Sequence, residues 1–338
     1  MKPIPLVRAN VVFPFVQFLN QIGAPTERLL RQVKLPVTTL ENPEVLIPAY
    51  LANDFLEQAA HREGIENLGV IVGQQTFAET FGVYGKLVSQ SLTLYDLLKT
   101  IEGLHAKFNS GARYDFKIVG DTVWLHHILD LSRSIVCKQS RCFALMAMLN
   151  VIRLATGSNW QPTAIYLQCN KFQDLDWCNN FANTRIHFNK AINAIAFPKS
   201  LLSMPLSNSL LANDTKSLLE AKQLLDITAP AQDFSGSLRQ LVRSLLSQGD
   251  FNITLMAESS GMSLRTFQRR LASEGMAFNR LVEQIRFEEA TRLLREPAIK
   301  VVEIGYELGY KDASNFRRAF RRWTGTSPRS FQKAHTKD

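Results

Sequence analysis

A chain of 338 residues exceeds the length at which one hydrophobic core stops growing, so two domains are expected. Hydrophobic residues make up 46% of the chain and charged residues 20%, which excludes a wholly disordered chain, a collagen-like chain and a small disulfide-framed domain. Of the net charge of +9, residues 236–338 carry +7, from 18 Lys and Arg against 11 Asp and Glu, as expected for a polyanion-binding domain attached to a nearly neutral one.

The first apolar segment, residues 11–19, is short and is interrupted by Pro14 and Gln17. Because no apolar run reaches the roughly 18 residues of a membrane-spanning helix, we expect no secretion signal, no membrane span and a cytoplasmic protein. Helical periodicity follows at residues 48–61, 92–108 and 142–155. The last of these helices is apolar over so broad a face that we place it in the core.

A period-two pattern predicts strands at residues 112–119, 122–129, 163–168, 185–188 and 194–197. The Gly-Asp dipeptide at 120–121 is a strong two-residue turn signal, so the first two strands are expected to form a hairpin. Direct pairing across this turn puts Asp115 opposite His126 on one face and Tyr114 with His127 on the other. The upstream region is therefore predicted to be α+β.

Three groups of side chains in this region are candidate functional sites. His126 and His127 are adjacent in a strand and point to opposite faces, so structural histidines are favoured over a metal site. Trp124, His126, Asp115 and Arg113 could line a polar pocket, although an ordinary charged sheet face is the favoured interpretation. The sequence identifies no effector-binding residues.

The cysteines are the third group. They lie at Cys137, Cys142, Cys169 and Cys178, and their spacings match no usual zinc-ligand pair. Buried thiols in a reducing cytoplasm are the favoured interpretation, with a redox switch between Cys137 and Cys142 as the alternative. We expect no metal and no cofactor.

The domain boundary is expected at residues 227–236, where Pro, Ala, Asp, Ser and Gly interrupt two helical patterns. The preceding pattern predicts an amphipathic helix over residues 209–225, and the following one a helix that stops at Gly249. The predicted organisation is a domain at residues 1–226, a linker, and a second domain at residues 237–338.

The last third repeats one plan of helix, glycine turn and helix. A small residue precedes each turn glycine by four positions, Ala257 before Gly261 and Gly305 before Gly309, and lets the two helices approach closely. Side-chain N-caps of the second helices are predicted at Ser263 and Asp312. This duplication predicts two helix-turn-helix units.

The second helix of each unit divides into two faces. The residues expected to pack inward are Phe267, Leu271, Phe316 and Phe320. The outward residues near each N-terminus, where a recognition helix presents side chains to base edges, are Arg265, Gln268, Arg269, Ser314, Arg317 and Arg318. Residues further along, suited to neutralising phosphates, are Arg270, Arg321 and Arg322. A solvated helix face is the alternative for any one arginine alone.

Residues 278–295 read as one helix between the two units. At about 1.5 Å per residue it would span roughly 27 Å. With its flanking turns it could hold the two recognition helices about one duplex turn apart, near 34 Å, so that one monomer occupies successive major grooves.

Residues 252–333 resemble the DNA-binding domain of the AraC/XylS family of bacterial transcription regulators. The resemblance is carried by VEIGYELGYKDASNFRRAFRRWTGTSPRSFQ at residues 302–332, including Gly309, Phe316, Phe320 and Trp323. It implies base contacts at the outward positions named above and at Ala313. The fold implied is an α+β N-terminal domain followed by an all-α domain with two helix-turn-helix units joined by a linker helix.

Residues 21–130 are similar to the arabinose-binding-like N-terminal domain of one subgroup of the family. The similarity is carried by IPAYLANDFLEQAA at residues 47–60 and YGKLVSQSLTLYDLLKTIEGLHAKFNSGARYDF at residues 84–116. It implies a regulator of transcription, an activator, that binds promoter DNA, works with RNA polymerase and responds to a small-molecule effector, with a homodimer possible. The alternative is a regulator whose N-terminal domain only dimerises and binds no ligand.

An enzyme is not expected. The sequence contains no phosphate-binding glycine loop, no HExxH and no GxSxG. A regulator fused to a DNA-repair methyl acceptor would need a zinc-held reactive cysteine, and the cysteine spacings do not provide one.

Overall fold

The computed structural model describes residues 2–37, 41–131, 136–172, 181–206, 215–247, 252–296 and 298–335. The chain forms two compact units, one of residues 5–230 and the other of residues 231–338 together with residues 1–4. The units divide between Pro230 and Ala231, inside the segment predicted as the linker. Among the described residues, no helix is long and apolar enough to cross a membrane.

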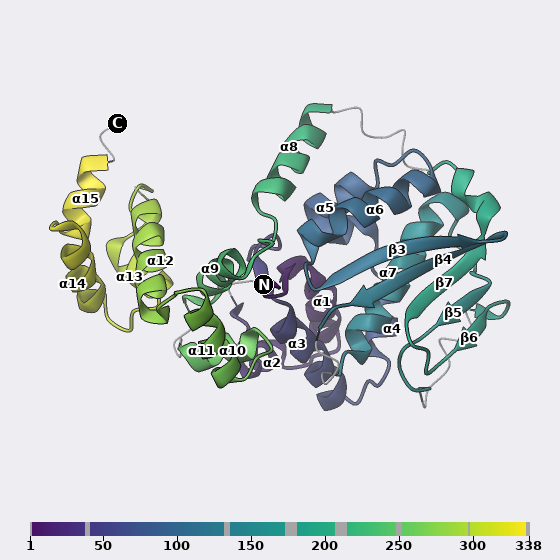
Figure 1. Cartoon of the computed structure of the whole chain (residues 1–338), viewed down its shortest axis with the longest axis horizontal. Coiled ribbons are helices and arrows are strands. Elements are labelled where there is room, and N and C mark those ends of the chain that lie inside the picture. The colour runs from purple at the N-terminus through teal and green to yellow at the C-terminus, as the bar shows by residue number, and fades with distance from the viewer. Residues whose placement is uncertain are drawn as a thin grey trace. The chain divides into compact units, whose positions relative to one another are not determined.

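The larger unit is an α+β domain, as predicted (Figure 1). Its elements are β1 (Leu6–Arg8), η1 (Ala9–Val11), α1 (Phe13–Gln21), α2 (Thr26–Gln32), β2 (Leu46–Pro48), α3 (Ala49–Arg62), α4 (Leu68–Gln74), η3 (Ala78–Phe81), α5 (Gly82–Val88), α6 (Leu94–Phe108), β3 (Ala112–Val119), β4 (Thr122–Leu129), α7 (Lys138–Thr156), β5 (Ala164–Tyr166), β6 (Arg185–His187), β7 (Asn193–Pro198), η5 (Lys199–Ser203) and α8 (Thr215–Ile227).

Five strands form one sheet in the order β3-β4-β7-β5-β6. All neighbours are antiparallel except β5 and β6, which are parallel. The predicted hairpin is confirmed with its register, in which Asp115 pairs with His126 and Tyr114 with His127. The first two strands of the domain, β1 and β2, form a separate antiparallel pair that the sequence did not predict.

The helix predicted over residues 142–155 is α7, and it lies in the core as expected. Residues such as Phe143, Met146, Leu149 and Ile152 are buried along it. It packs against β4 and β7 of the sheet and against α4. This arrangement makes α7 the centre of the domain.

The N-terminal core contains a partly open cavity of about 100 Å³. It lies on the face of the hairpin that carries Tyr114 and His127. The opposite hairpin face carries the candidate polar pocket of the sequence analysis. There His126 Nδ1 lies 2.7 Å from Asp115 Oδ1, and Arg113 pairs with Asp130, so these side chains form an ordinary charged sheet face.

The last helix of this unit is α8. The sequence predicted a helix over residues 209–225; α8 accounts for its second half, whereas residues 209–214 lie outside the described residues, as do Gly249 and Cys178. α8 packs against α5 and α6. Lys107 Nζ of α6 lies 2.6 Å from Asp226 Oδ1, and the buried Arg8 donates to Thr228 Oγ1 over 2.8 Å.

The thiols of Cys137, Cys142 and Cys169 are free and buried. Burial raises the pKa of the Cys137 thiol to about 11. Cys142 Sγ lies 3.9 Å from Cys169 Sγ. The fold therefore places Cys142 beside Cys169, whereas the predicted redox switch would pair Cys142 with Cys137.

Candidate nucleic-acid interface

The smaller unit is all helical over its described residues (Figure 1). Its elements are α9 (Phe234–Leu245), α10 (Ile253–Ser259), α11 (Leu264–Ser273), α12 (Phe278–Leu293), α13 (Val301–Glu307), α14 (Ala313–Thr324) and α15 (Pro328–His335). α10 packs on α11 and α13 on α14, each pair joined by a short turn. These pairs are the two helix-turn-helix units.

The two turns are built alike. Gly261 and Gly309 have φ angles of 65° and 74°, in the left-handed region that favours glycine. In the first unit, the Met262 N–H donates to the Ala257 carbonyl over 2.9 Å; in the second, the Tyr310 N–H donates to the Gly305 carbonyl over 3.0 Å. Such bonds satisfy helix carbonyls left over at a C-terminus. The small residues at 257 and 305 therefore occupy equivalent places, as the sequence pattern predicted.

The second helices begin at the predicted caps. Ser263 Oγ accepts from the Thr266 N–H over 3.2 Å, and Asp312 Oδ1 accepts from the Ser314 N–H over 2.8 Å. Caps of this kind stabilise a helix by about 1 kcal/mol. Because each cap fixes the first turn, it also fixes the direction of the side chains that follow.

The inward residues are as predicted: Phe267, Leu271, Phe316 and Phe320 are buried. The predicted base-contacting residues Arg265, Gln268, Arg269, Ser314, Arg317 and Arg318 are exposed, and Ala313 is half-buried at the start of α14. Within the described part of the chain, no hydrogen bond or ion pair engages the side chains of Arg265, Gln268, Arg269 and Arg317. Arg318 donates to Asn315 Oδ1 over 2.5 Å on its own helix.

The three predicted phosphate contacts are placed differently. Arg321 is exposed, and Arg322 is exposed but pairs with Glu283 of α12. Arg270 is half-buried: its guanidinium lies 4.5 Å from the centre of the Phe234 ring and donates to the backbone carbonyl of Lys2. Arg270 therefore anchors α11 to α9 and to the start of the chain, a role that the sequence analysis did not foresee.

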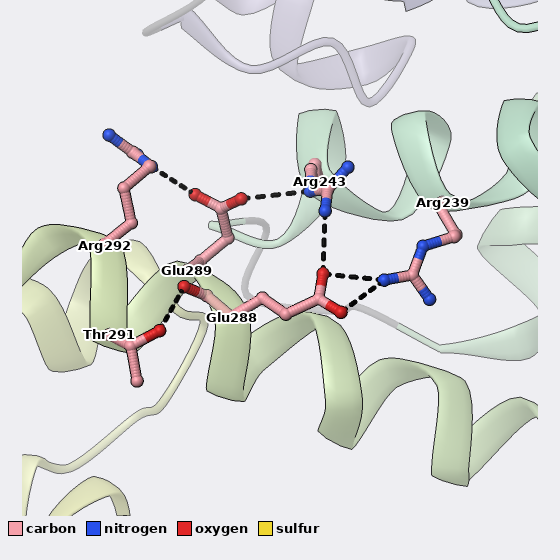
Figure 2. Close-up of polar contacts among 6 residues, drawn as sticks. All are labelled: Arg239, Arg243, Glu288, Glu289, Thr291 and Arg292. Carbon is pink, nitrogen blue, oxygen red and sulfur yellow. Dashed lines mark hydrogen bonds and ion pairs between the residues drawn. The ribbon is translucent and has the colours of Figure 1, made fainter.

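A network of ion pairs joins α9 to α12, and Figure 2 shows its members. Arg239 Nη2 lies 2.5 and 2.6 Å from the two carboxylate oxygens of Glu288, and Arg243 Nη2 lies 2.8 Å from Glu288 Oε2. Glu289 joins Arg243 to Arg292 over 3.0 and 2.8 Å. These arginines are thus committed to carboxylates within the protein. By contrast, Arg265, Arg269 and Arg317 of α11 and α14 are exposed and have no carboxylate partner among the described residues.

The helix between the units, α12, ends two residues before the predicted residue 295. Arg286 Nε donates to the Leu308 carbonyl over 3.0 Å, and its guanidinium lies 4.8 Å from the centre of the Tyr310 ring. At the other end, the Phe278 ring packs against the Phe267 ring. α12 therefore fastens to both helix-turn-helix units.

Several features of this unit are not visible in the sequence pattern. The first residues of the chain belong to it, because the Ile4 N–H donates to Ser237 Oγ over 2.8 Å. Arg280 and Arg329 are exposed, like the arginines predicted to contact DNA. The sequence contains no pattern that distinguishes these two from any other arginine on a surface helix. Among the described residues, no cluster of His, Cys, Asp and Glu could hold a metal ion.

This arrangement can bind a polyanion. Exposed guanidinium groups at the start of two capped helices can neutralise phosphates and donate two hydrogen bonds to guanine, and Gln268 can do so to adenine. Two helix-turn-helix units on one helical scaffold define the smaller unit as the DNA-binding domain of a transcription regulator.

Comparisons with known proteins agree. A helix-turn-helix domain family matches residues 256–334, and the family of the arabinose-binding domain of the AraC transcription regulator matches residues 23–206. An uncharacterized HTH-type transcriptional regulator of Mycobacterium tuberculosis is 31% identical over 329 residues, 93% of this chain and 92% of that protein. The chain belongs to the AraC family of transcriptional regulators.

Two further known proteins are similar to this chain, one over part of its length and one at low sequence identity. The ornithine utilization regulator of Pseudomonas aeruginosa is 31% identical over 142 residues, 41% of each chain. The crystal structure of the transcriptional regulator CdpR from the same organism covers 96% of this chain and 98% of its own at 19% identity, with a TM-score of 0.41.

Proposed function

We propose that this transcription regulator reads its operator with α11 and α14 and activates transcription in the cytoplasm under the control of a small-molecule effector bound by the larger unit. The observation that carries the proposal is the contrast among the arginines of the smaller unit. Those of α9 are neutralised by Glu288 and Glu289, whereas Arg265, Arg269 and Arg317 are exposed near the starts of two capped helices.

In this proposal, Arg265, Gln268, Arg269, Ala313, Ser314, Arg317 and Arg318 contact base edges or the sugars and phosphates beside them. Arg321 and Arg322 neutralise phosphates, and Arg322 exchanges its pairing with Glu283 for a phosphate. Arg270 holds α11 against α9 through its contact with the Phe234 ring. RNA polymerase is the expected partner at the promoter, and the fastening of both units to α12 supports placement in successive major grooves by one monomer.

Effector control is supported by the cavity and by its neighbours. The cavity is lined by residues of α5 and α6, and α8, the last helix before the domain boundary, packs on these same two helices. A ligand that shifts α5 or α6 changes the surface on which α8 lies. This is a physical route by which occupancy of the cavity can bias the smaller unit, and the coupling is reciprocal.

The test starts from genomic fragments captured by the full chain. Binding to one such fragment and to a shuffled duplex of the same composition is measured across a salt series, and transcription from the fragment is measured with purified RNA polymerase. The proposal expects preference for the captured fragment, a steep loss of affinity with salt and increased transcription. Equal affinity for the two duplexes would overturn operator reading; reduced transcription would overturn activation alone.

A further inference from the structure

The cavity of the larger unit is lined mainly by residues of α3, α5, α6, α7, β3 and β4, with further contributions from β1, η1 and η3. Its volume is about 100 Å³. A single water needs about 10–15 Å³, and an apolar cavity of about 150 Å³ binds benzene. The space therefore suits several waters or one small ring.

The walls of this cavity carry no formal charge. Among the described residues that line it, none is Asp, Glu, Lys or Arg, and most are aliphatic or aromatic. Transfer of an ion into such surroundings without a counter-charge is strongly unfavourable. Carboxylates, phosphates and ammonium compounds are therefore poor occupants.

The polar groups of the wall are almost all engaged by the protein. Asn53 Nδ2 donates to the Val136 carbonyl over 2.8 Å, and Asn53 Oδ1 accepts from Ser140 over 2.8 Å. The Tyr114 hydroxyl donates to the Ala144 carbonyl over 3.3 Å. Each of these groups therefore already has a partner within the protein.

Two histidines are the exception. His105 and His127 are 7% and 6% exposed, and their rings flank the Tyr114 ring at centroid distances of 4.7 and 4.9 Å. Within the described part of the chain, His105 Nε2 and His127 Nδ1 are buried and make no hydrogen bond. Buried polar atoms of this kind are normally paired, so their orphan state at a cavity wall points to a missing partner.

The contact with Tyr84 indicates which ring nitrogen of His105 carries the proton. Its hydroxyl lies 3.2 Å from His105 Nδ1, and burial keeps the phenol protonated by raising its pKa. If the phenol donates to Nδ1, the remaining proton of the neutral imidazole is on Nε2. His105 Nε2 then offers a donor to the cavity. Burial lowers the pKa of His105 to about 3 and that of His127 to about 4, so both rings are neutral at pH 7.

We propose that the cavity binds a neutral, largely apolar molecule of about one ring, whose carbonyl or hydroxyl oxygen accepts a hydrogen bond from His105 Nε2, with His127 beside it as a second polar contact. This ligand class rests on the proposed effector control, because it names what would occupy that site. It also departs from a sugar. A pentose carries several hydroxyls, and with two orphan nitrogens available most of these hydroxyls would be buried without a hydrogen-bond partner, which is unfavourable.

The test compares ligands of one shape and different charge. Cyclohexanone is the neutral probe, cyclohexanecarboxylate and cyclohexylammonium are its charged counterparts, and L-arabinose is the sugar. Binding to the full chain is followed by thermal unfolding and by calorimetric titration. The proposal expects cyclohexanone to raise the Tm in a concentration-dependent way and the other three to leave it unchanged at equal concentration. No effect of cyclohexanone, or a larger effect of any of the other three, would overturn it.

Variants locate the site. His105→Phe removes the donor and keeps a ring, and it should weaken cyclohexanone binding roughly three- to tenfold. Ala147→Leu places a larger side chain at the cavity wall and should abolish binding. His126→Phe, on the opposite sheet face, is the matched control and should bind as the wild type does. Unchanged binding in both His105→Phe and Ala147→Leu would overturn the site, and the wild-type comparison of ligands stands even if a variant fails to fold.

The outcome is separable from that of the proposed function. Binding is measured on the protein without DNA, and the affinity for a captured genomic fragment is measured afterwards with and without cyclohexanone. Cyclohexanone binding that leaves DNA affinity unchanged would contradict effector control and support the ligand class. A response of DNA affinity to the carboxylate or the sugar alone would support effector control and contradict the ligand class.

Discussion

Gly309 lies against the backbone carbonyl of Leu246, so closely that a Cβ on Gly309 would stand 2.1 Å from that oxygen. Gly309 also has a φ angle of 74°. Gly309→Ala should therefore destabilise the smaller unit by at least about 2 kcal/mol, since the strain of a left-handed alanine adds to the clash. Urea unfolding followed by circular dichroism measures this.

Gly305→Ala is the matched control. A Cβ there would lie 3.5 Å from Phe316 Cβ, an ordinary contact, and the first unit has Ala257 at the equivalent place. Because alanine favours a helix over glycine by up to about 1 kcal/mol, this variant should be neutral or more stable. Equal losses at positions 305 and 309 would contradict the assignment of the turn.

Arg269→Ala and Arg318→Ala test the sorting of arginines. Each should weaken binding to a captured genomic fragment by roughly 1–3 kcal/mol and leave the unfolding free energy unchanged, because these side chains are exposed. Arg321→Ala should lower the affinity for all duplexes alike. Competition binding with the captured fragment and a shuffled duplex separates the two effects, and a change of sequence preference in Arg321→Ala would mean that the sorting is wrong.

Glu288→Gln tests the network between α9 and α12. It removes the carboxylate that pairs with the half-buried Arg239 and the exposed Arg243. A loss of about 1 kcal/mol in the unfolding free energy of the smaller unit is expected. The control is Glu283→Gln, which breaks a single exposed pair with Arg322 and should cost little. Chemical unfolding of both variants compares them, and an equal cost would remove the special role of the network.

The buried histidines predict a pH dependence. In the unfolded chain His105 and His127 titrate near the ordinary pKa of about 6.5, whereas burial lowers their pKa to about 3 and about 4 in the fold. The unfolded state therefore binds more protons below pH 6.5. The destabilising contribution is absent above that pH and grows as the pH falls, by up to roughly 1.4 kcal/mol per pH unit for each histidine.

His105→Phe should remove about half of this acid sensitivity. Urea unfolding of the wild type and the variant between pH 7 and pH 5, followed by tryptophan fluorescence, measures the slope. An unchanged slope in the variant would show that His105 is not a buried neutral base in the folded protein.

Much of the fold follows from local pattern. The hairpin of β3 and β4 was predictable to the residue because a Gly-Asp turn fixes register and the alternation fixes the faces. The caps at Ser263 and Asp312 were predictable for the same reason, since a cap acts within three residues. The pairing of β1 with β2 depends on contacts between residues about 40 apart in the chain, which no local pattern reports.

The exposure of the outward arginines was predictable from the sequence, whereas the packing of Arg270 was not. The 3.6-residue period puts Arg270 near the edge of the α11 apolar face, and only the fold brings Phe234 and Lys2 to it. The cavity had a visible signal. His105 is four residues after Ile101 on the buried stripe of α6, and His127 alternates with Leu125 on the buried face of β4. The sequence analysis interpreted His127 as a structural histidine and did not single out His105, and only the fold shows that both lie at one cavity.

The most direct test of the central assignment is a salt titration of DNA binding by the wild-type chain and by Arg269→Ala combined with Arg318→Ala. We predict that the logarithm of the wild-type affinity falls steeply and linearly with the logarithm of the salt concentration, and that the double variant loses most of its preference for the captured fragment over the shuffled duplex. A flat salt response in the wild type, or an undiminished preference in the double variant, would contradict reading of DNA by α11 and α14.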